Sequence, residues 1–137
     1  MTNANTLLNK TKHGFNSLEV SEKYVNSALK WLATWLTDDS FKDYVPQIAY
    51  LIKKEKWNFL LDSFYQVIPF GTGGRRGLVG VGPNRINTWT IQASAQGHSQ
   101  YLIRQYGEQA RRRGVVLAFD VRKYTQKGIY DETLANP

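Results

Sequence analysis

Six of the chain's eleven glycines lie within the sixteen residues from Phe70 to Arg85, and this cluster limits the possible folds more than any other feature. Glycine adopts backbone conformations closed to other residues, and repeated glycines weaken both helices and strands. Glycines spaced this closely also allow backbone N–H groups to approach a ligand. The cluster therefore predicts a loop with a backbone-based role, dividing the chain into two parts.

The part before the loop has the pattern of amphipathic helices. Apolar residues recur at helical spacing from Ser17 to Leu36, and a second stripe runs from Pro46 to Phe64, with a break expected at Asn58. Trp31 and Trp35 lie one turn apart, so we expect them to pack in a core and not to stack on nucleic-acid bases. Residues 1–66 are predicted to be structural, with order expected beyond the first dozen residues.

The part after the loop begins with another predicted helix. Asn87 or Thr88 can cap its start, and Arg111–Arg113 in its last turn would complement the negative end of the helix dipole. Gly114 suits the left-handed position that follows a helix. The helix is defined by apolar and aromatic positions at helical spacing and one histidine: Ile91, Ala95, His98, Leu102 and Tyr106.

A short continuous apolar run, Val115–Phe119, follows this helix. Such a run predicts a strand buried on both faces of a sheet covered by helices. Asp120, Val121 and Arg122 would stand at its carboxyl end, where open α/β sheets place their ligands. Residues 120–125 are therefore a candidate site.

Charge is unevenly distributed along the chain. The formal net charge is +7, and all eight arginines lie after residue 69, whereas the lysines before it are nearly balanced by acidic residues. The planar guanidinium group suits paired contacts with phosphate. The second half is therefore expected to meet an anionic partner, either a phosphate ester or a nucleic acid.

Composition excludes several classes of site. The chain has no cysteine, so disulfides and thiolate sites are ruled out, and a cytoplasmic location is expected. No run approaches the roughly 20 apolar residues that span a bilayer. His13 and His98 stand far apart without neighbouring carboxylates, a poor pattern for a metal site.

Two familiar phosphate loops do not fit the glycine cluster. The Walker pattern requires a Gly-Lys-Ser/Thr ending that is absent here, and Arg76 stands where the dinucleotide fingerprint needs its third glycine, counting from Gly71. The sequence therefore gives no support to ATP hydrolysis or NAD binding.

The segment Phe70–Gly77 instead resembles the opening signature of the alpha-D-phosphohexomutase family, which includes phosphoglucomutase and phosphomannomutase. The following Gly82–Asn87, the helix and the Asp120-Val121-Arg122 turn keep the order of that family's first domain. The resemblance implies an α/β fold. In it, residues 1–66 form a helical N-terminal extension and residues 67–137 form the first part of the mixed-sheet α/β/α domain I, with the later domains absent.

The resemblance also implies a reaction: interconversion of hexose 1-phosphate and hexose 6-phosphate through a phosphoserine enzyme and a bisphosphate intermediate. Arg76 would be the active-site arginine, Arg122 would orient the phosphorylated side chain, and Asp120 would in turn orient Arg122. Arg75 holds the variable position of the motif and is expected to point elsewhere. Phosphate binding would fall to the tip of the loop and its arginine: Thr72, Gly73, Gly74 and Arg76.

Thr125 stands where many relatives carry the phosphorylated serine, three residues after Arg122. Either Thr125 accepts the phosphoryl group, or residues 123–137 begin an insertion and the serine lies beyond residue 137. The family's metal loop is absent here, so Mg²⁺ and the activator hexose 1,6-bisphosphate are expected of the full-length enzyme, and this chain alone is expected to be inactive.

The resemblance implies a hexose phosphate as partner, with no nucleic acid and no membrane. It decides neither glucose against mannose nor the oligomeric state. The alternative left open is a small basic module that holds nucleic acid through phosphate contacts.

Overall fold

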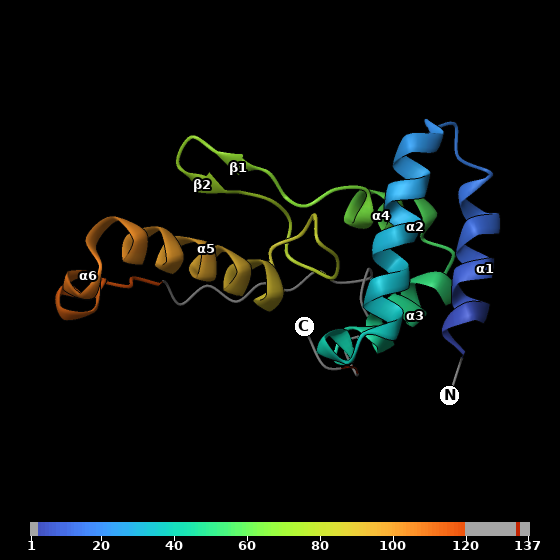
Figure 1. Ribbon diagram of the computed structural model, residues 1–137. Coiled ribbons are helices and arrows are strands. Elements are labelled where there is room, and N and C mark those ends of the chain that lie inside the picture. Colours follow the sequence, from blue (N-terminus) through green and yellow to red (C-terminus); the bar gives the residue numbers. More distant parts are fainter. Residues whose placement is uncertain (1–2, 120–133, 135–137) are drawn as a thin grey trace.

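The computed structural model describes residues 3–119 and 134, and it is mostly helical with one small two-stranded sheet (Figure 1). The helices α1 to α4 pack together at one end, and α5 and α6 extend away from them beside the hairpin of β1 and β2. In chain order the elements are α1 (Ala4–Phe15), α2 (Glu22–Thr37), the 3₁₀ turn η1 (Asp39–Phe41), α3 (Val45–Lys53), α4 (Trp57–Phe64), β1 (Phe70–Gly71), β2 (Gly74–Arg75), α5 (Thr88–Tyr106) and α6 (Glu108–Arg113).

Helices α1 to α4, called the helical unit below, enclose the core of the molecule. Trp35 is fully buried and its ring lies 4.4 Å from that of Phe41 and 5.5 Å from that of Phe64, measured between centroids. Trp31 packs against the same core. The prediction that these tryptophans serve packing and not base stacking is confirmed.

The predicted helix boundaries were partly wrong. The helix expected from Ser17 begins at Glu22, and α1 precedes it in a segment for which no individual helix was predicted. The second predicted helix is broken between Lys53 and Trp57, before Asn58, because Glu55 adopts a left-handed φ of 54° that an α-helix cannot contain.

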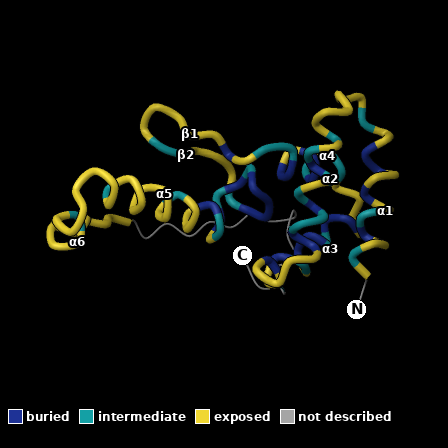
Figure 2. Tube along the Cα trace, viewed as in Figure 1, coloured by how far each residue is buried: buried dark blue, intermediate teal, exposed yellow. Residues whose placement is uncertain are grey.

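Helix α5 stands largely free of the rest of the structure. Thr90, in its first turn, is its one buried residue, and the tube in Figure 2 is mostly exposed from there to α6. Helix α5 ends at Tyr106, and Gly107, with φ 53°, separates it from α6. Gly114 follows α6 with a positive φ of 65°, as predicted, but its ψ of −168° lies outside the left-handed helical conformation that was expected there.

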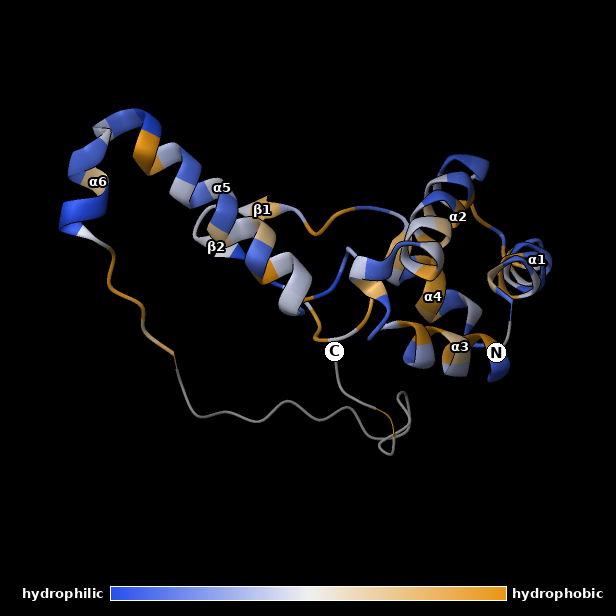
Figure 3. Ribbon diagram, turned by 60° about the horizontal axis from the view of Figure 1, so that its bottom comes forward, coloured by the Kyte–Doolittle hydropathy of each residue, from blue (hydrophilic) through white to orange (hydrophobic). Residues whose placement is uncertain are grey.

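The strand predicted over Val115–Phe119 is absent from the structure. These residues form no ladder, and the side chains of Val116 and Phe119 are 98% and 95% exposed. Figure 3 shows them as an apolar stretch leading away from α6. A strand needs a neighbour to pair with its N–H and C=O groups, and within the described residues the one ladder joins β1 to β2. The described residues are therefore an α/β fragment, as expected, although their sheet has two strands and Val115–Phe119 adds none to it.

Among the described residues, no helix has both the length and the apolar character needed to cross a membrane.

Candidate functional site

The glycine-rich loop opens as a tight antiparallel hairpin. Phe70 pairs with Arg75 and Gly71 with Gly74, which leaves Thr72 and Gly73 as the tip. Gly74 has φ 120°, a conformation that side-chain-bearing residues rarely adopt, and a Cβ on Gly71 would lie 3.2 Å from the carbonyl oxygen of Gly74. The turn therefore requires glycine at position 74 through its backbone conformation, and it leaves little room for a side chain at position 71.

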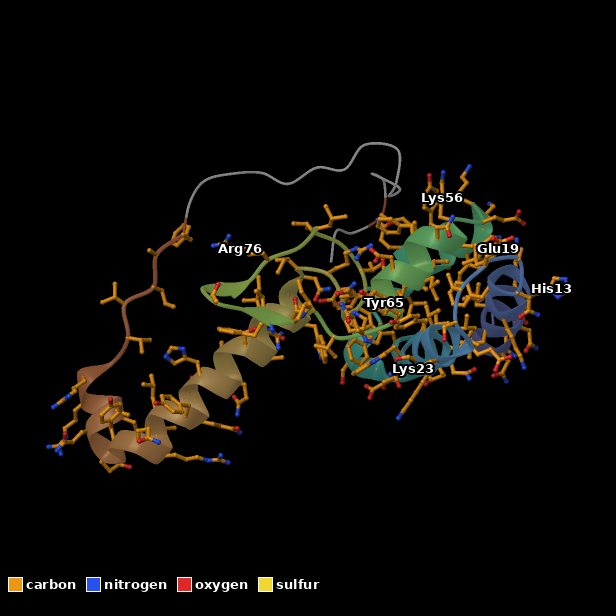
Figure 4. The ribbon with its side chains drawn as sticks, turned by 90° about the horizontal axis from the view of Figure 1, so that it is seen from above. His13, Glu19, Lys23, Lys56, Tyr65 and Arg76 are labelled. Atoms are coloured by element: carbon orange, nitrogen blue, oxygen red, sulfur yellow. The ribbon has the colours of Figure 1, made fainter. Side chains whose placement is uncertain are left out.

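The two neighbouring arginines of the hairpin have different surroundings. Arg75 is half-buried, and its Nη1 donates to the carbonyl oxygen of Thr90, 3.2 Å away in the first turn of α5. Arg76 is exposed, and its Nη2 lies 3.8 Å from the position that a Cβ on Gly73 would occupy. Figure 4 shows Arg76 beside the hairpin, far from His13 on α1. The hairpin thus holds one arginine against the fold and presents the other beside its glycine tip.

The loop beyond the hairpin is closed by its own backbone. The N–H of Ile86 donates to the carbonyl oxygen of Leu78 (2.8 Å), and the N–H of Gly80 donates to that of Ile86 (3.1 Å). Gly82 has φ 110° and lies so close to α4 that an added Cβ would fall 2.4 Å from the carbonyl oxygen of Ser63. This segment therefore forms a hydrogen-bonded base that rests on the helical unit.

Asn87 joins that base to α5. Its Nδ2 donates to the carbonyl oxygens of Gly80 (2.8 Å) and Gly82 (2.9 Å), while its Oδ1 accepts from the N–H of Thr90 (3.0 Å). The Thr90 hydroxyl oxygen accepts from the N–H of Asn87 at 3.0 Å, which completes a reciprocal capping box. Of the two caps that the sequence allowed, Asn87 is the one used.

The remaining predicted site residues fall into two groups. Thr72, Gly73 and Arg76 are exposed at the hairpin, and Gly74 is half-buried in β2. Asp120, Arg122 and Thr125 lie outside the described residues, so the expectation that they lie close to Arg76 stays a prediction.

Sequence reasoning missed Arg85. It is 3% exposed, and its Nη2 lies 2.6 Å from Oδ2 of Asp62 in α4. Its guanidinium carbon also lies 4.8 Å from the centre of the Phe59 ring. One sequence feature could have indicated its burial: Arg85 follows glycine, proline and asparagine and precedes isoleucine, so no acidic residue nearby in the sequence can pair with it.

The described residues do not form the Mg²⁺ site that the resemblance implies for the full-length enzyme. Nowhere among them do three histidine or carboxylate side chains come close enough to hold a metal ion. His13 and His98 are both exposed, the first on α1 and the second on α5.

The geometry suits binding of an anion. An exposed guanidinium group beside a glycine tip offers charge and several donors to a phosphate-sized group, with little side-chain bulk in the way. The capped start of α5 lies close to the hairpin through the bond from Arg75 to Thr90.

Comparison with known proteins gives similarity to sugar phosphomutases. The chain is 36% identical over 100 residues to the phosphopentomutase of Mus musculus, covering 73% of the chain and 15% of that enzyme. It is 31% identical over 96 residues to the phosphopentomutase of Homo sapiens, covering 70% of the chain and 16% of that enzyme. The phosphoribomutase of Saccharomyces cerevisiae is 31% identical over 75 residues, covering 55% and 12% respectively.

The chain thus spans about a sixth or less of the length of these curated relatives. No family model matches it, and no solved structure matches it. The resemblance to phosphomutases is supported by these relatives, but their names refer to pentose and ribose and not to hexose.

Proposed function

We propose that this chain is the phosphate-binding opening segment of a sugar-phosphate mutase, in which Arg76 contacts the phosphoryl group that moves between enzyme and sugar. The observation that carries the proposal is the exposed Arg76 beside the glycine tip, in a chain similar to phosphopentomutases. Phosphoryl transfer depends mainly on positioning and on stabilising the charge of the moving group. An arginine held on a paired hairpin can supply both.

The substrate class that we propose is a pentose phosphate, interconverted between its 1-phosphate and 5-phosphate forms. The names of the relatives favour pentose, whereas the motif alone led to the expectation of a hexose phosphate. The phosphoserine, the bisphosphate intermediate and the magnesium ion implied by the resemblance would belong to the complete enzyme.

The test is a titration of the chain with inorganic phosphate and ribose 5-phosphate, followed through the backbone amide resonances of residues 70–77. We expect saturable shifts at the hairpin, and we expect Arg76→Ala to weaken binding by about tenfold or more, since a charge-assisted hydrogen bond is lost. Arg104→Ala is the matched control, because it removes the same charge from an exposed position on α5.

Equal weakening in the two variants would contradict the proposal, because it would mean that phosphate responds to net charge and not to the hairpin. The sugar class is tested separately by comparing ribose 5-phosphate with glucose 6-phosphate. We also expect no mutase turnover by this chain alone, with either ribose 1-phosphate or glucose 1-phosphate as substrate.

The nucleic-acid alternative has one observation in its favour. The residues Arg111, Arg112 and Arg113 are exposed on α6, far from the helical unit (Figure 2). Arg111 is 3.5 Å from Glu108, which offsets part of that charge. A gel shift with duplex DNA, lost on rising salt and on replacing these arginines, would favour this alternative.

A further inference from the structure

The buried side chain of Arg85 connects the loop to the helical unit through Asp62 and Phe59 of α4. Its Nη2 lies 2.6 Å from Oδ2 of Asp62, and its Nη1 donates to the carbonyl oxygens of Asn84 (3.1 Å) and Asp62 (3.4 Å). The guanidinium group also lies over the ring of Phe59. A buried charge is tolerated when it is paired and hydrogen-bonded, so this position depends on α4.

The residue before it reinforces the same contact. Asn84 donates from its Nδ2 to the carbonyl oxygen of Asp62 at 2.7 Å, and its backbone N–H donates to that of Ser63 at 3.0 Å. Gln66 donates to Oδ1 of Asn84 at 3.3 Å. The loop therefore joins the carboxyl-terminal end of α4 by several bonds and not by one ion pair.

The segment fixed in this way also holds the hairpin. The Thr90 hydroxyl lies 2.9 Å from the carbonyl oxygen of Arg85, and the carbonyl oxygen of Thr90 accepts from Arg75 in β2. Contacts therefore run without a gap from Asp62 through Arg85 and Thr90 to Arg75, the neighbour of Arg76 in sequence.

From these contacts we infer that Arg85 is a positioning residue for the anion site: paired with Asp62, it fixes the hairpin that presents Arg76. The inference rests on the proposed function and adds to it that the helical unit sets the geometry of phosphate binding. Arg85 is buried and acts through Thr90 and Arg75, without contact to the anion itself.

The experiment compares Arg85→Met, Arg85→Lys and Asp62→Asn with the unchanged chain. Methionine keeps the apolar contact with Phe59 but loses the charge, whereas lysine keeps a charge for Asp62. We expect Arg85→Met to weaken binding of inorganic phosphate at residues 70–77 by about fivefold, Arg85→Lys to restore part of the loss, and Asp62→Asn to weaken it less.

Ile52→Val, at a fully buried position of α3, serves as the stability control. It is expected to lower the unfolding temperature without changing phosphate affinity, when each variant is measured well below its own unfolding midpoint. If Arg85→Met lowers affinity no more than Ile52→Val does, Arg85 serves stability alone and the inference is wrong. Asp62 is 56% exposed, so Asp62→Asn gives a readout even if Arg85→Met does not fold.

A measurement without phosphate separates this inference from the proposed function. Hydrogen exchange at the amide of Gly74, which pairs with Gly71 across the turn, should quicken by about fivefold in Arg85→Met and stay unchanged in Arg76→Ala. Unchanged exchange in Arg85→Met overturns the positioning role. Unchanged phosphate affinity in Arg76→Ala overturns the proposed function instead.

Discussion

The phenolic oxygen of Tyr44 accepts a hydrogen bond from the backbone N–H of Trp89, 3.1 Å away and 45 positions later in the chain. Trp89 is the second residue of α5, where backbone N–H groups have no partner within the helix. Its indole ring lies 5.7 Å from that of Trp35, between centroids. The helical unit therefore both caps and packs the start of the helix that carries Thr90.

Replacing Tyr44 with phenylalanine tests that bond. The ring contact with Trp35 should survive, while the N–H of Trp89 is left without its partner, so we expect a loss of about 1 to 2 kcal/mol in the free energy of unfolding. Urea denaturation followed by tryptophan fluorescence gives the value. Tyr50→Phe, at a half-buried position of α3, is the control and should change stability little. Equal losses in both variants would show that the bond to Trp89 is not the cause.

Two glycines give opposite predictions when each is changed to alanine. Gly82→Ala puts a side chain on a residue with φ 110° and against the carbonyl oxygen of Ser63, so we expect a loss of about 2 kcal/mol or more. Gly97→Ala lies within α5 with open space around it, so we expect greater helicity and a gain of up to about 1 kcal/mol. Circular dichroism and urea denaturation measure both, and a neutral Gly82→Ala would mean that the loop does not rest on α4 as described.

The sequence predicted those helices whose buried faces consist mainly of large apolar side chains. The stripes of α2, α3 and α4 were visible because large apolar side chains form their buried faces. Helix α1 was missed because half of its buried residues are Thr11 and Gly14, which a count of apolar positions overlooks. Gly14 lies flat against the indole of Trp57, where any Cβ would collide.

The same distinction separates the parts of the candidate site that the sequence predicted from those that it did not. The glycine-rich hairpin could be predicted because a residue such as Gly74, with φ 120°, is marked in the sequence by the glycine itself. Arg85 did not, because its burial depends on Asp62, a partner 23 residues away that no local pattern reveals. Val115–Phe119 misled for the opposite reason: an apolar run records a tendency to be buried, and the described residues supply no strand to cover it.

Asn87 performs two tasks that a single substitution can separate. Asn87→Asp keeps a good N-cap oxygen for Thr90 but turns the two donated bonds to Gly80 and Gly82 into contacts between oxygens. We therefore expect a loss of about 2 kcal/mol or more, although the cap survives. Thr88→Asp is the control: it adds the same charge one residue later at an exposed position, where the helix dipole favours it. If both variants gain stability, the hydrogen bonds from Asn87 to Gly80 and Gly82 contribute nothing measurable to the free energy of unfolding.

The exposed apolar run should govern how the chain behaves at high concentration. Val115 to Phe119 contains three aliphatic residues in succession and an aromatic one, all at least 62% exposed, which is the kind of segment that pairs with other chains. We expect the double variant Val116→Lys and Phe119→Lys to bind less of a hydrophobic dye and to scatter less light at equal concentration. Because added charge alone raises solubility, the matched control places lysine at Ser99 and Gln109, two exposed polar positions on α5 and α6. If the control reduces dye binding and scattering as much as the double variant does, the charge and not the apolar run is responsible.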